Sequence, residues 1–151
     1  MADSLRVLIV EDEALLLMQL ELFLDDEGHV VVGTAVSSAE AMELALRDEA
    51  DLALVDIHLA DGPLGCEVGR FIAQNTRAAV VFMTANPKRI PDDFSGAVGV
   101  IAKPYTHTGM KAALAYLVAA VSSPPPTLRK PVSLTLSPAF EREWRTDAGS
   151  T

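Results

Sequence analysis

Five residues with chemically useful side chains stand at the ends of four short apolar runs. They are the acidic pair Glu11 and Asp12, then Asp56, Thr84 and Lys103. Taken singly, each has an ordinary explanation, since polar side chains often cap the loop that follows a strand. Their repeated occurrence at the ends of successive apolar runs instead favours a single site assembled from all five.

The chemistry that suits this set is the transfer of a phosphoryl group to a carboxylate. Three carboxylates held together repel one another unless a cation lies among them, and a ligand set made only of oxygen suits Mg²⁺. Asp56, at the centre of LALVDIHLADG, is then the nucleophile that forms an aspartyl phosphate. Lys103 would pair with the phosphoryl oxygens as a point charge, and Thr84 would donate a hydrogen bond to one of them.

Alternating strands and helices are expected to hold these residues. Short, almost continuous apolar runs predict buried strands at Leu5–Val10, Val30–Ala35, Leu52–Val55, Ala79–Met83 and Ala97–Ala102. Apolar residues at helical spacing predict helices at Ala14–Glu27, Ala39–Arg47, Gly65–Gln74 and from Thr106 or Thr108 to Val121. The prolines in Asn86–Gly96 favour a loop or a short helical turn there. This alternation predicts an open α/β sheet of five parallel strands, with the ligand-binding edge at their carboxyl ends.

The composition predicts a folded, acidic protein. Half of the 151 residues are hydrophobic, and 21 acidic against 12 basic side chains give a net charge of −9. This balance disfavours a nucleic-acid-binding face, which needs a basic patch. The apolar runs are too short to cross a membrane, and the start MADSLRVLIV lacks the features of a secretory leader. Cys66 is the only cysteine, so a single chain offers neither a disulfide nor a thiolate metal site. We therefore expect a soluble protein of the cytoplasm.

Over about Leu5–Val121, the chain resembles the receiver domain of two-component response regulators. The resemblance rests on the pair Glu11–Asp12, on Asp56 in LVDIHLADG, on Thr84 in VVFMTA and on Lys103 in KPY. It implies a doubly wound, flavodoxin-like sheet with the strand order 2-1-3-4-5. It also implies that a histidine kinase or a histidine phosphotransfer protein phosphorylates Asp56.

The same resemblance implies a metal site and brings out one departure. It implies that Asp12, Asp56 and the backbone carbonyl of His58 hold Mg²⁺, with Glu11 acting through water. Many receivers carry Tyr or Phe three residues before the lysine, and this ring turns inward on phosphorylation. Here that position is Val100, so the usual coupling through an aromatic ring is not expected.

Two other functions remain open from the sequence. A phosphatase of the haloacid dehalogenase type also uses an aspartyl nucleophile with Mg²⁺, Thr and Lys, but it needs a second Asp where this chain has His58. A pseudo-receiver binds partners without phosphorylation and would normally have lost part of the acidic set, which is complete here. We favour a response regulator that catalyses phosphoryl transfer only to its own aspartate and signals by contact with an unidentified protein.

A second apolar stripe on the first helix predicts a docking surface for the phosphodonor. It consists of Leu15, Met18 and Leu22, roughly opposite the face that packs on the sheet. Cover by the C-terminal tail, or by a second copy in a homodimer, is the alternative.

The chain is expected to divide into a receiver over residues 1–123 and a proline-rich linker with a short tail over residues 124–151. In the tail, Val132–Leu136 predicts a strand, and Ser137–Pro138 predicts the start of a helix over Ala139–Arg145. So short a segment cannot bury a core alone, so we expect Phe140 and Trp144 to anchor it on the receiver, on a second copy or on a partner. A disordered end is the alternative.

Overall fold

The five predicted apolar runs form parallel strands in the computed structural model, which describes residues 4–144. They are β1 (Arg6–Val10), β2 (Val30–Ala35), β3 (Leu52–Asp56), β4 (Ala79–Thr84) and β5 (Gly99–Ala102). The order β2-β1-β3-β4-β5, with parallel pairing throughout, confirms the predicted doubly wound arrangement. Every residue of the central strand β3 is buried, as its unbroken apolar sequence predicts.

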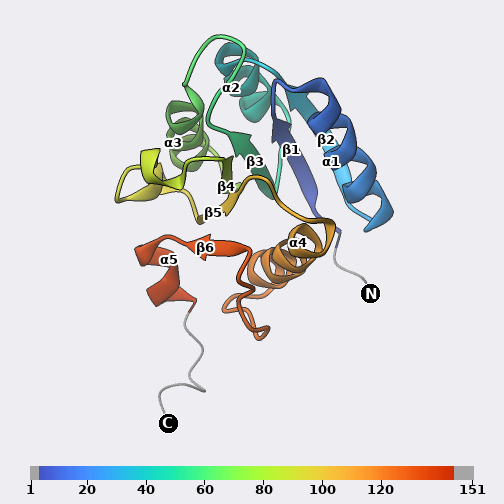
Figure 1. Ribbon diagram of the computed structural model, residues 1–151, viewed down its shortest axis with the longest axis vertical. Helices are drawn as coiled ribbons and strands as arrows, with labels where there is room; N and C mark the ends of the chain where they lie inside the picture. The colour runs from blue at the N-terminus through green and yellow to red at the C-terminus, as the bar shows by residue number, and fades with distance from the viewer. Residues whose placement is uncertain (1–3, 145–151) are drawn as a thin grey trace.

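Helices cover both faces of the sheet (Figure 1). The four long helices are α1 (Ala14–Asp26), α2 (Ser38–Arg47), α3 (Gly65–Asn75) and α4 (His107–Ser122). Two buried clusters separate the layers: one joins the sheet to α1 and α4, and the other joins it to α2 and α3. Because the helices pack on the two faces of the sheet, they do not cover the edge at which the strands end. The residues that follow the strands can therefore meet there.

Local sequence signals set where several helices begin and end. The Ser37 hydroxyl accepts a hydrogen bond from the backbone of Glu40, and the Thr106 hydroxyl accepts one from Gly109, so each caps a helix. Gly28, with a φ of +86°, follows α1 in the left-handed region that terminates helices at low cost. Because Thr106 is the cap, α4 begins at the first of the two predicted positions.

The connection from β4 to β5 contains no α-helix, as its prolines predict. It forms two short 3₁₀ turns, η1 (Pro87–Arg89) and η2 (Phe94–Gly96). Pro87 stands at the start of η1, where its missing N–H costs no hydrogen bond.

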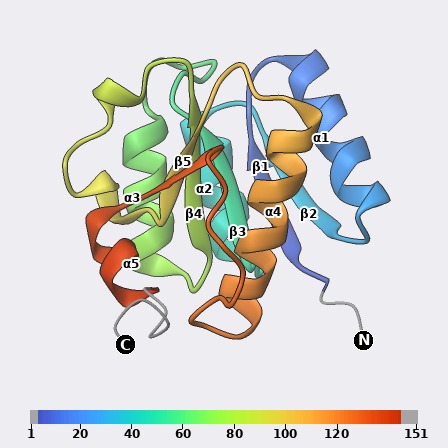
Figure 2. The ribbon, with the colours of Figure 1, turned by 60° about the horizontal axis from the view of Figure 1, so that its bottom comes forward.

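The tail adds a sixth strand, which corrects the prediction of a sheet with five strands. Strand β6 (Leu134–Leu136) pairs antiparallel with β5, and the short helix α5 (Pro138–Glu143) follows it (Figure 2). The predicted strand is too long at its start, because Val132 is 98% exposed and precedes the pairing. The Ser137 cap is confirmed by its hydrogen bond from Phe140, and the predicted last helical residue, Arg145, lies outside the described residues. The tail therefore packs on the receiver and is not a disordered end over the part described.

No helix within residues 4–144 combines the length and the apolar character that crossing a bilayer requires.

Candidate functional site

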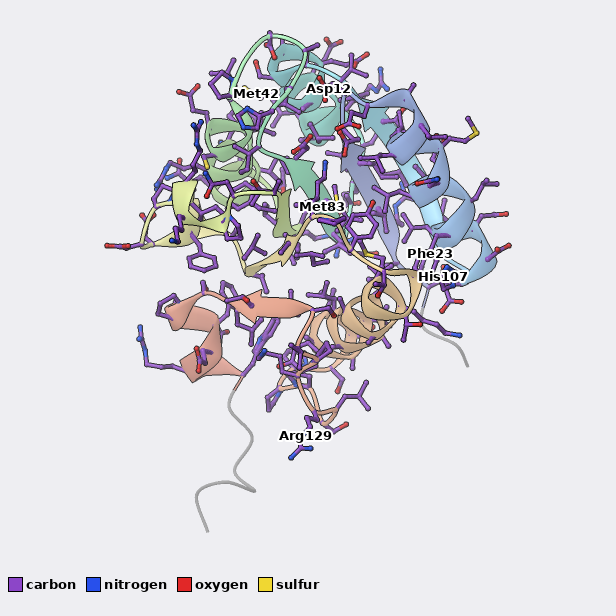
Figure 3. All side chains as sticks on the ribbon, in the orientation of Figure 1. Asp12, Phe23, Met42, Met83, His107 and Arg129 are labelled. Atoms are coloured by element: carbon purple, nitrogen blue, oxygen red, sulfur yellow. The ribbon has the colours of Figure 1, made fainter. Side chains whose placement is uncertain are left out.

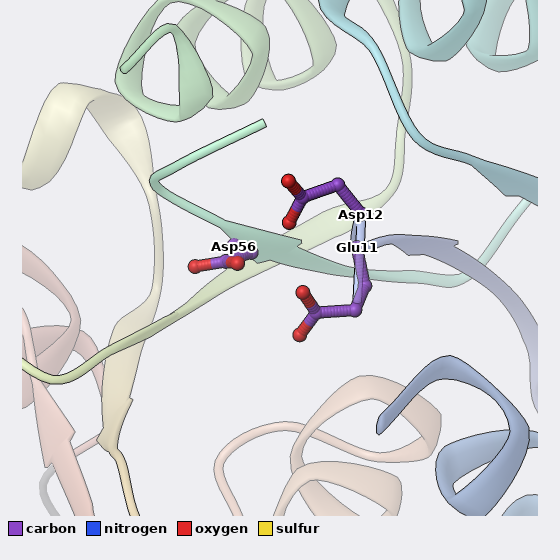
Figure 4. A group of neighbouring side chains, drawn as sticks. All are labelled: Glu11, Asp12 and Asp56. Carbon is purple, nitrogen blue, oxygen red and sulfur yellow. The ribbon is translucent and has the colours of Figure 1, made fainter. Parts of the chain in front are cut away.

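The predicted site forms at the carboxyl edge of the sheet, where β1 and β3 end side by side. Val10 and Val55 are partners in the parallel register, so the residues that follow them, Glu11 and Asp56, emerge together. Figure 4 shows the carboxylates of Glu11, Asp12 and Asp56 around this point. One ligand atom from each of the three lies within 4.8 Å of the others. The convergence predicted from the sequence is thus present.

Lys103 joins this group from the end of β5. Its Nζ lies 2.9 Å from Oε1 of Glu11 and 3.3 Å from Oδ2 of Asp56. Glu11 is completely buried and Asp56 is buried, so both ion pairs lie in a medium that screens charge weakly. Asp12 is exposed, which leaves an entrance on its side of the group.

The electrostatics of the site follow from crowding carboxylates around one ammonium. Burial raises the pKa of Glu11 above its ordinary value, and the neighbouring Asp56 adds to this rise, although the hydrogen bond from Lys103 opposes it. Burial lowers the pKa of Lys103, but its hydrogen bond to Glu11 and the charge of Asp56 outweigh burial and raise that pKa overall. Lys103 therefore stays charged at neutral pH, and it pairs with two of the three carboxylates, those of Glu11 and Asp56.

This donor set fits a hard divalent cation. Three carboxylates with one counter-charge leave an excess of negative charge, and Mg²⁺ prefers oxygen ligands of this kind. The carboxylate oxygens lie close enough together to share one ion. The predicted use of the His58 backbone carbonyl is a finer detail that stays a prediction. The imidazole of His58 is exposed, and its backbone N–H is 3.4 Å from Oδ1 of Asp56.

Gly65 packs against the backbone of Asp56 and Ile57, a contact that the sequence did not reveal. Its backbone N–H donates to the carbonyl of Ile57 at 2.9 Å, which ties the start of α3 to the chain just after Asp56. A Cβ at Gly65 would lie 2.2 Å from the Asp56 carbonyl oxygen and 2.4 Å from Cα of Ile57. Only glycine allows this approach. The sequence showed a glycine at a helix start, but not the backbone against which it packs.

The fold and this edge chemistry agree with a comparison of the sequence with known families. The profile of the family described as "Response regulator receiver domain" matches residues 7–115. The chain is a member of the response regulator receiver family. It therefore belongs to the proteins of two-component signalling, and its similar proteins carry receivers as well.

Two curated relatives illustrate the match. The receiver is 33% identical over 111 residues to the "Phyllosphere-induced regulator PhyR" of Methylorubrum extorquens. The matched region covers 72% of this chain and 42% of the relative. It is 36% identical over 104 residues to the "Transcriptional regulatory protein PdtaR" of Mycobacterium tuberculosis, covering 67% of this chain and 50% of the relative. The chain thus spans about half the length of these relatives.

A solved receiver confirms the architecture. The solution structure of the Erythrobacter litoralis PhyR receiver domain has a TM-score of 0.68 and 32% sequence identity to this chain. The likeness covers 76% of this chain and 90% of that domain. The likeness agrees with the flavodoxin-like arrangement of the parallel strands.

Thr84 ends β4 next to this receiver's site, and its hydroxyl oxygen already accepts a hydrogen bond from the loop that follows. Asp56 pairs in register with Met83, so Thr84 stands one position further along the neighbouring strand. Its Oγ1 accepts the backbone N–H of Asn86 at 3.0 Å, and its carbonyl accepts the N–H of Lys103 at 2.8 Å. The hydroxyl proton is free to point elsewhere, so Thr84 remains a candidate donor.

Val100, at the position of the usual aromatic ring, is 4% exposed and packs in the cluster under α2 and α3. A small buried side chain there offers no ring that could turn.

A groove of about 400 Å³ lies between α1 and α4. Phe23 of α1 and His107 of α4 meet edge to face at its wall, with ring centroids 4.9 Å apart (Figure 3). The predicted stripe lies beside it: Leu22 lines the groove, and Leu15, Met18 and Leu22 are 64%, 53% and 60% exposed. As far as the structure describes the tail, to Trp144, it packs beside β5 and leaves this stripe exposed.

Proposed function

We propose that this receiver accepts a phosphoryl group on Asp56 from the phosphohistidine of a histidine kinase or a histidine phosphotransfer protein. It then signals by contact with another protein and has no separate enzymatic output. The observation that carries this proposal is the position of Lys103, whose ammonium reaches both Glu11 and Asp56 at the carboxyl edge.

The arrangement supports an in-line displacement. An oxygen of the Asp56 carboxylate forms a bond to phosphorus as the bond from phosphorus to the donor's imidazole nitrogen breaks, and the nitrogen keeps the electron pair. Lys103, already 3.3 Å from Asp56, pairs with the oxygens of the arriving group. The Thr84 hydroxyl donates to one of these oxygens once its proton turns toward Asp56. These roles are mostly positioning and charge compensation.

Asp12 and Asp56, with the His58 carbonyl, would hold Mg²⁺, and Glu11 would act through water. Such an ion, when bound, supplies charge compensation for the carboxylates and the phosphoryl oxygens. The protein's part is to fix these oxygens in place, which β1 and β3 do through their shared register.

Phosphorylation with a small phosphodonor tests the assignment of Asp56. With acetyl phosphate and Mg²⁺, intact mass should show one added phosphoryl group in the natural chain and none in Asp56→Asn, which cannot form the acyl phosphate. Asp92→Asn is the matched control, because Asp92 is an exposed aspartate away from the site. Equal labelling of the Asp56→Asn protein would reject the proposal.

Thermal stability tests the metal ligands separately. Millimolar Mg²⁺ should raise the melting temperature, since it binds the native state and relieves repulsion among the three carboxylates. The rise should shrink by at least about half in Asp12→Ala, because one of the carboxylate ligands is then absent. It should persist in Glu13→Ala, the adjacent exposed residue. A full rise in Asp12→Ala would place the ion elsewhere.

The exposed stripe on α1 would receive the phosphodonor. Three large apolar side chains beside a groove suit a partner helix, and the groove opens next to the N-terminal part of α4. Docking there would bring a phosphohistidine over the carboxyl edge, which α1 itself adjoins through Glu13, its N-cap.

A further inference from the structure

Strand β5 would be the last strand of the sheet on its side, but the chain's own tail pairs with its outer edge. Strand β6 pairs antiparallel with β5, and Leu134 opposite Ile101 and Leu136 opposite Gly99 point their side chains into the core beside α4. The pairing is only three residues long, so its hydrogen bonds alone are a weak attachment. A strand edge of this kind accepts an added strand from any polypeptide of suitable sequence.

Two glycines of the receiver shape the surface that the tail crosses. A Cβ at Gly99 would lie 2.4 Å from the Thr135 carbonyl oxygen, so β6 approaches β5 closer than a side chain permits. A Cβ at Gly109 would lie 3.3 Å from Cβ of Ser133, whose hydroxyl donates to the Gly109 carbonyl at 2.7 Å. This fit indicates a built surface and not a chance contact.

Aromatic side chains provide the second anchor. Trp144 is buried against Tyr116 of α4, with ring centroids 6.2 Å apart, and against Phe140 at 5.1 Å. Between strand and anchor, the Ser137 N–H donates to the carbonyl of Val98 at 2.8 Å. The recognised pattern is thus an extended segment with two apolar residues two apart, followed by two aromatic residues four apart.

The tail also lies next to two segments that connect to the proposed phosphorylation site: the loop that follows Thr84, and strand β5, which precedes Lys103. A hollow of about 540 Å³ is lined by Pro87, three residues after Thr84, by Val100 of β5, and by Val132 and Thr135 of the tail. Strand β5, which carries the tail, ends one residue before Lys103. We therefore expect movement of Thr84 or Lys103 toward a group on Asp56 to shift Pro87 and Val100, which line the hollow together with the tail.

We propose that the β5 edge, with the face of α4 beside it, is an interaction surface for a polypeptide that adds an antiparallel strand, and that the tail occupies it as an internal ligand until Asp56 is phosphorylated. The partner carries the tail's own pattern of alternating apolar residues followed by aromatic anchors. The dependence on phosphorylation rests on the proposed function, whereas the surface itself does not.

Competition between the tethered tail and a free partner explains why the partner cannot bind the β5 edge before phosphorylation. A tethered segment acts at an effective concentration on the order of millimolar, so a free partner of ordinary affinity cannot displace it. If phosphorylation weakens the tail's hold, then removal of the tail must in turn favour phosphorylation by the same factor.

A labelled peptide of residues 131–144 tests the surface in the full-length protein. Leu134→Asp should free the tail, because Leu134 is fully buried, and Leu136→Asp is a second releasing variant. Circular dichroism checks that each variant is folded. The peptide should bind these variants at least about tenfold more tightly than the unphosphorylated natural chain. Gly99→Ala added to Leu134→Asp should abolish binding, whereas Gly33→Ala, whose Cβ meets only ordinary contacts, should not.

The emission of Trp144, the chain's single tryptophan, tests the dependence on phosphorylation. Intact mass first establishes that Asp56 is modified, so a failure of the proposed function is seen separately. On modification, Trp144 should shift toward the emission of an exposed indole, and the natural chain should bind the peptide. Asp56→Asn should show neither change. A peptide that binds no folded releasing variant would overturn the surface, and unchanged Trp144 emission at full phosphorylation would overturn the gating.

Discussion

At the scale of single residues, His29 links the stability of the receiver to pH. Its Nδ1 accepts the backbone N–H of Leu5 at 3.1 Å, which requires the neutral ring. Burial lowers the pKa of His29 from 6.5, with the charge of Glu27 opposing the change. Because the folded pKa lies below the unfolded one, this stabilisation is present above pH 6.5 and is lost as the pH falls through the folded pKa. Melting temperatures measured between pH 7.5 and 5 should fall with the pH. The fall should correspond to a loss on the order of 1 kcal/mol in the free energy of unfolding.

His29→Asn is the matched variant for that measurement, because the amide oxygen can accept the same hydrogen bond but cannot be protonated. The variant should lose this component of the pH dependence and keep the rest. An identical pH profile in both proteins would assign the dependence to other groups.

The residues of the candidate site could be predicted from the sequence because the ends of parallel strands must meet. Glu11, Asp56 and Lys103 converge for this reason alone, once the strands are identified. Gly65 could not be predicted, since its role depends on how closely the start of α3 approaches the Asp56–Ile57 backbone. Nor could the engagement of the Thr84 hydroxyl by Asn86, which depends on the path of the following loop.

At the scale of elements, the exposed stripe of α1 predicts a specific kinetic defect. Met18→Lys places a charge at the centre of the stripe without touching the site, since Met18 is 53% exposed. Transfer from a cognate phosphodonor should slow by about tenfold, equivalent to about 1.4 kcal/mol, the loss typical of an interface anchor. Labelling by acetyl phosphate should be unchanged, and Met18→Leu should behave as the natural chain. Equal slowing with both donors would indicate damage to the site, and no slowing would give the stripe another purpose.

Elements whose bounds are set by local residues were predicted well. Elements whose bounds depend on hydrogen bonding to a neighbouring strand were not. Strand β2 begins and ends at the predicted residues, and the prolines of residues 86–96 exclude a helix as expected. Strand β5 starts two residues later than predicted. Ala97, although apolar, closes η2 through its hydrogen bond to Phe94, and the ladder with β4 begins only at Gly99. Apolar character alone does not distinguish a strand from the buried end of a turn.

At the scale of the whole molecule, the sequence left the destination of the tail undecided. The alternation in VSLTL and the spacing of Phe140 and Trp144 predict a docked segment, but not the surface that receives it. That surface depends on an unpaired strand edge and on Gly99, whose missing side chain admits β6. These are properties of the folded receiver, so no local pattern in the tail could reveal them.

The path of the signal through the molecule yields the last prediction. Val100 has no ring to turn, whereas residues 86–96 follow Thr84 with two short turns and no α-helix. A segment with so few regular hydrogen bonds costs little to rearrange. Hydrogen exchange should therefore change in residues 86–96 and in β6 when the receiver binds beryllofluoride, a phosphoryl mimic, with Mg²⁺. These two regions border the same hollow, so they should respond together. Asp56→Asn under the same conditions should show no change. Altered exchange confined to α4 would instead assign transmission to the groove between α1 and α4, and would exclude the route through Pro87 and the tail.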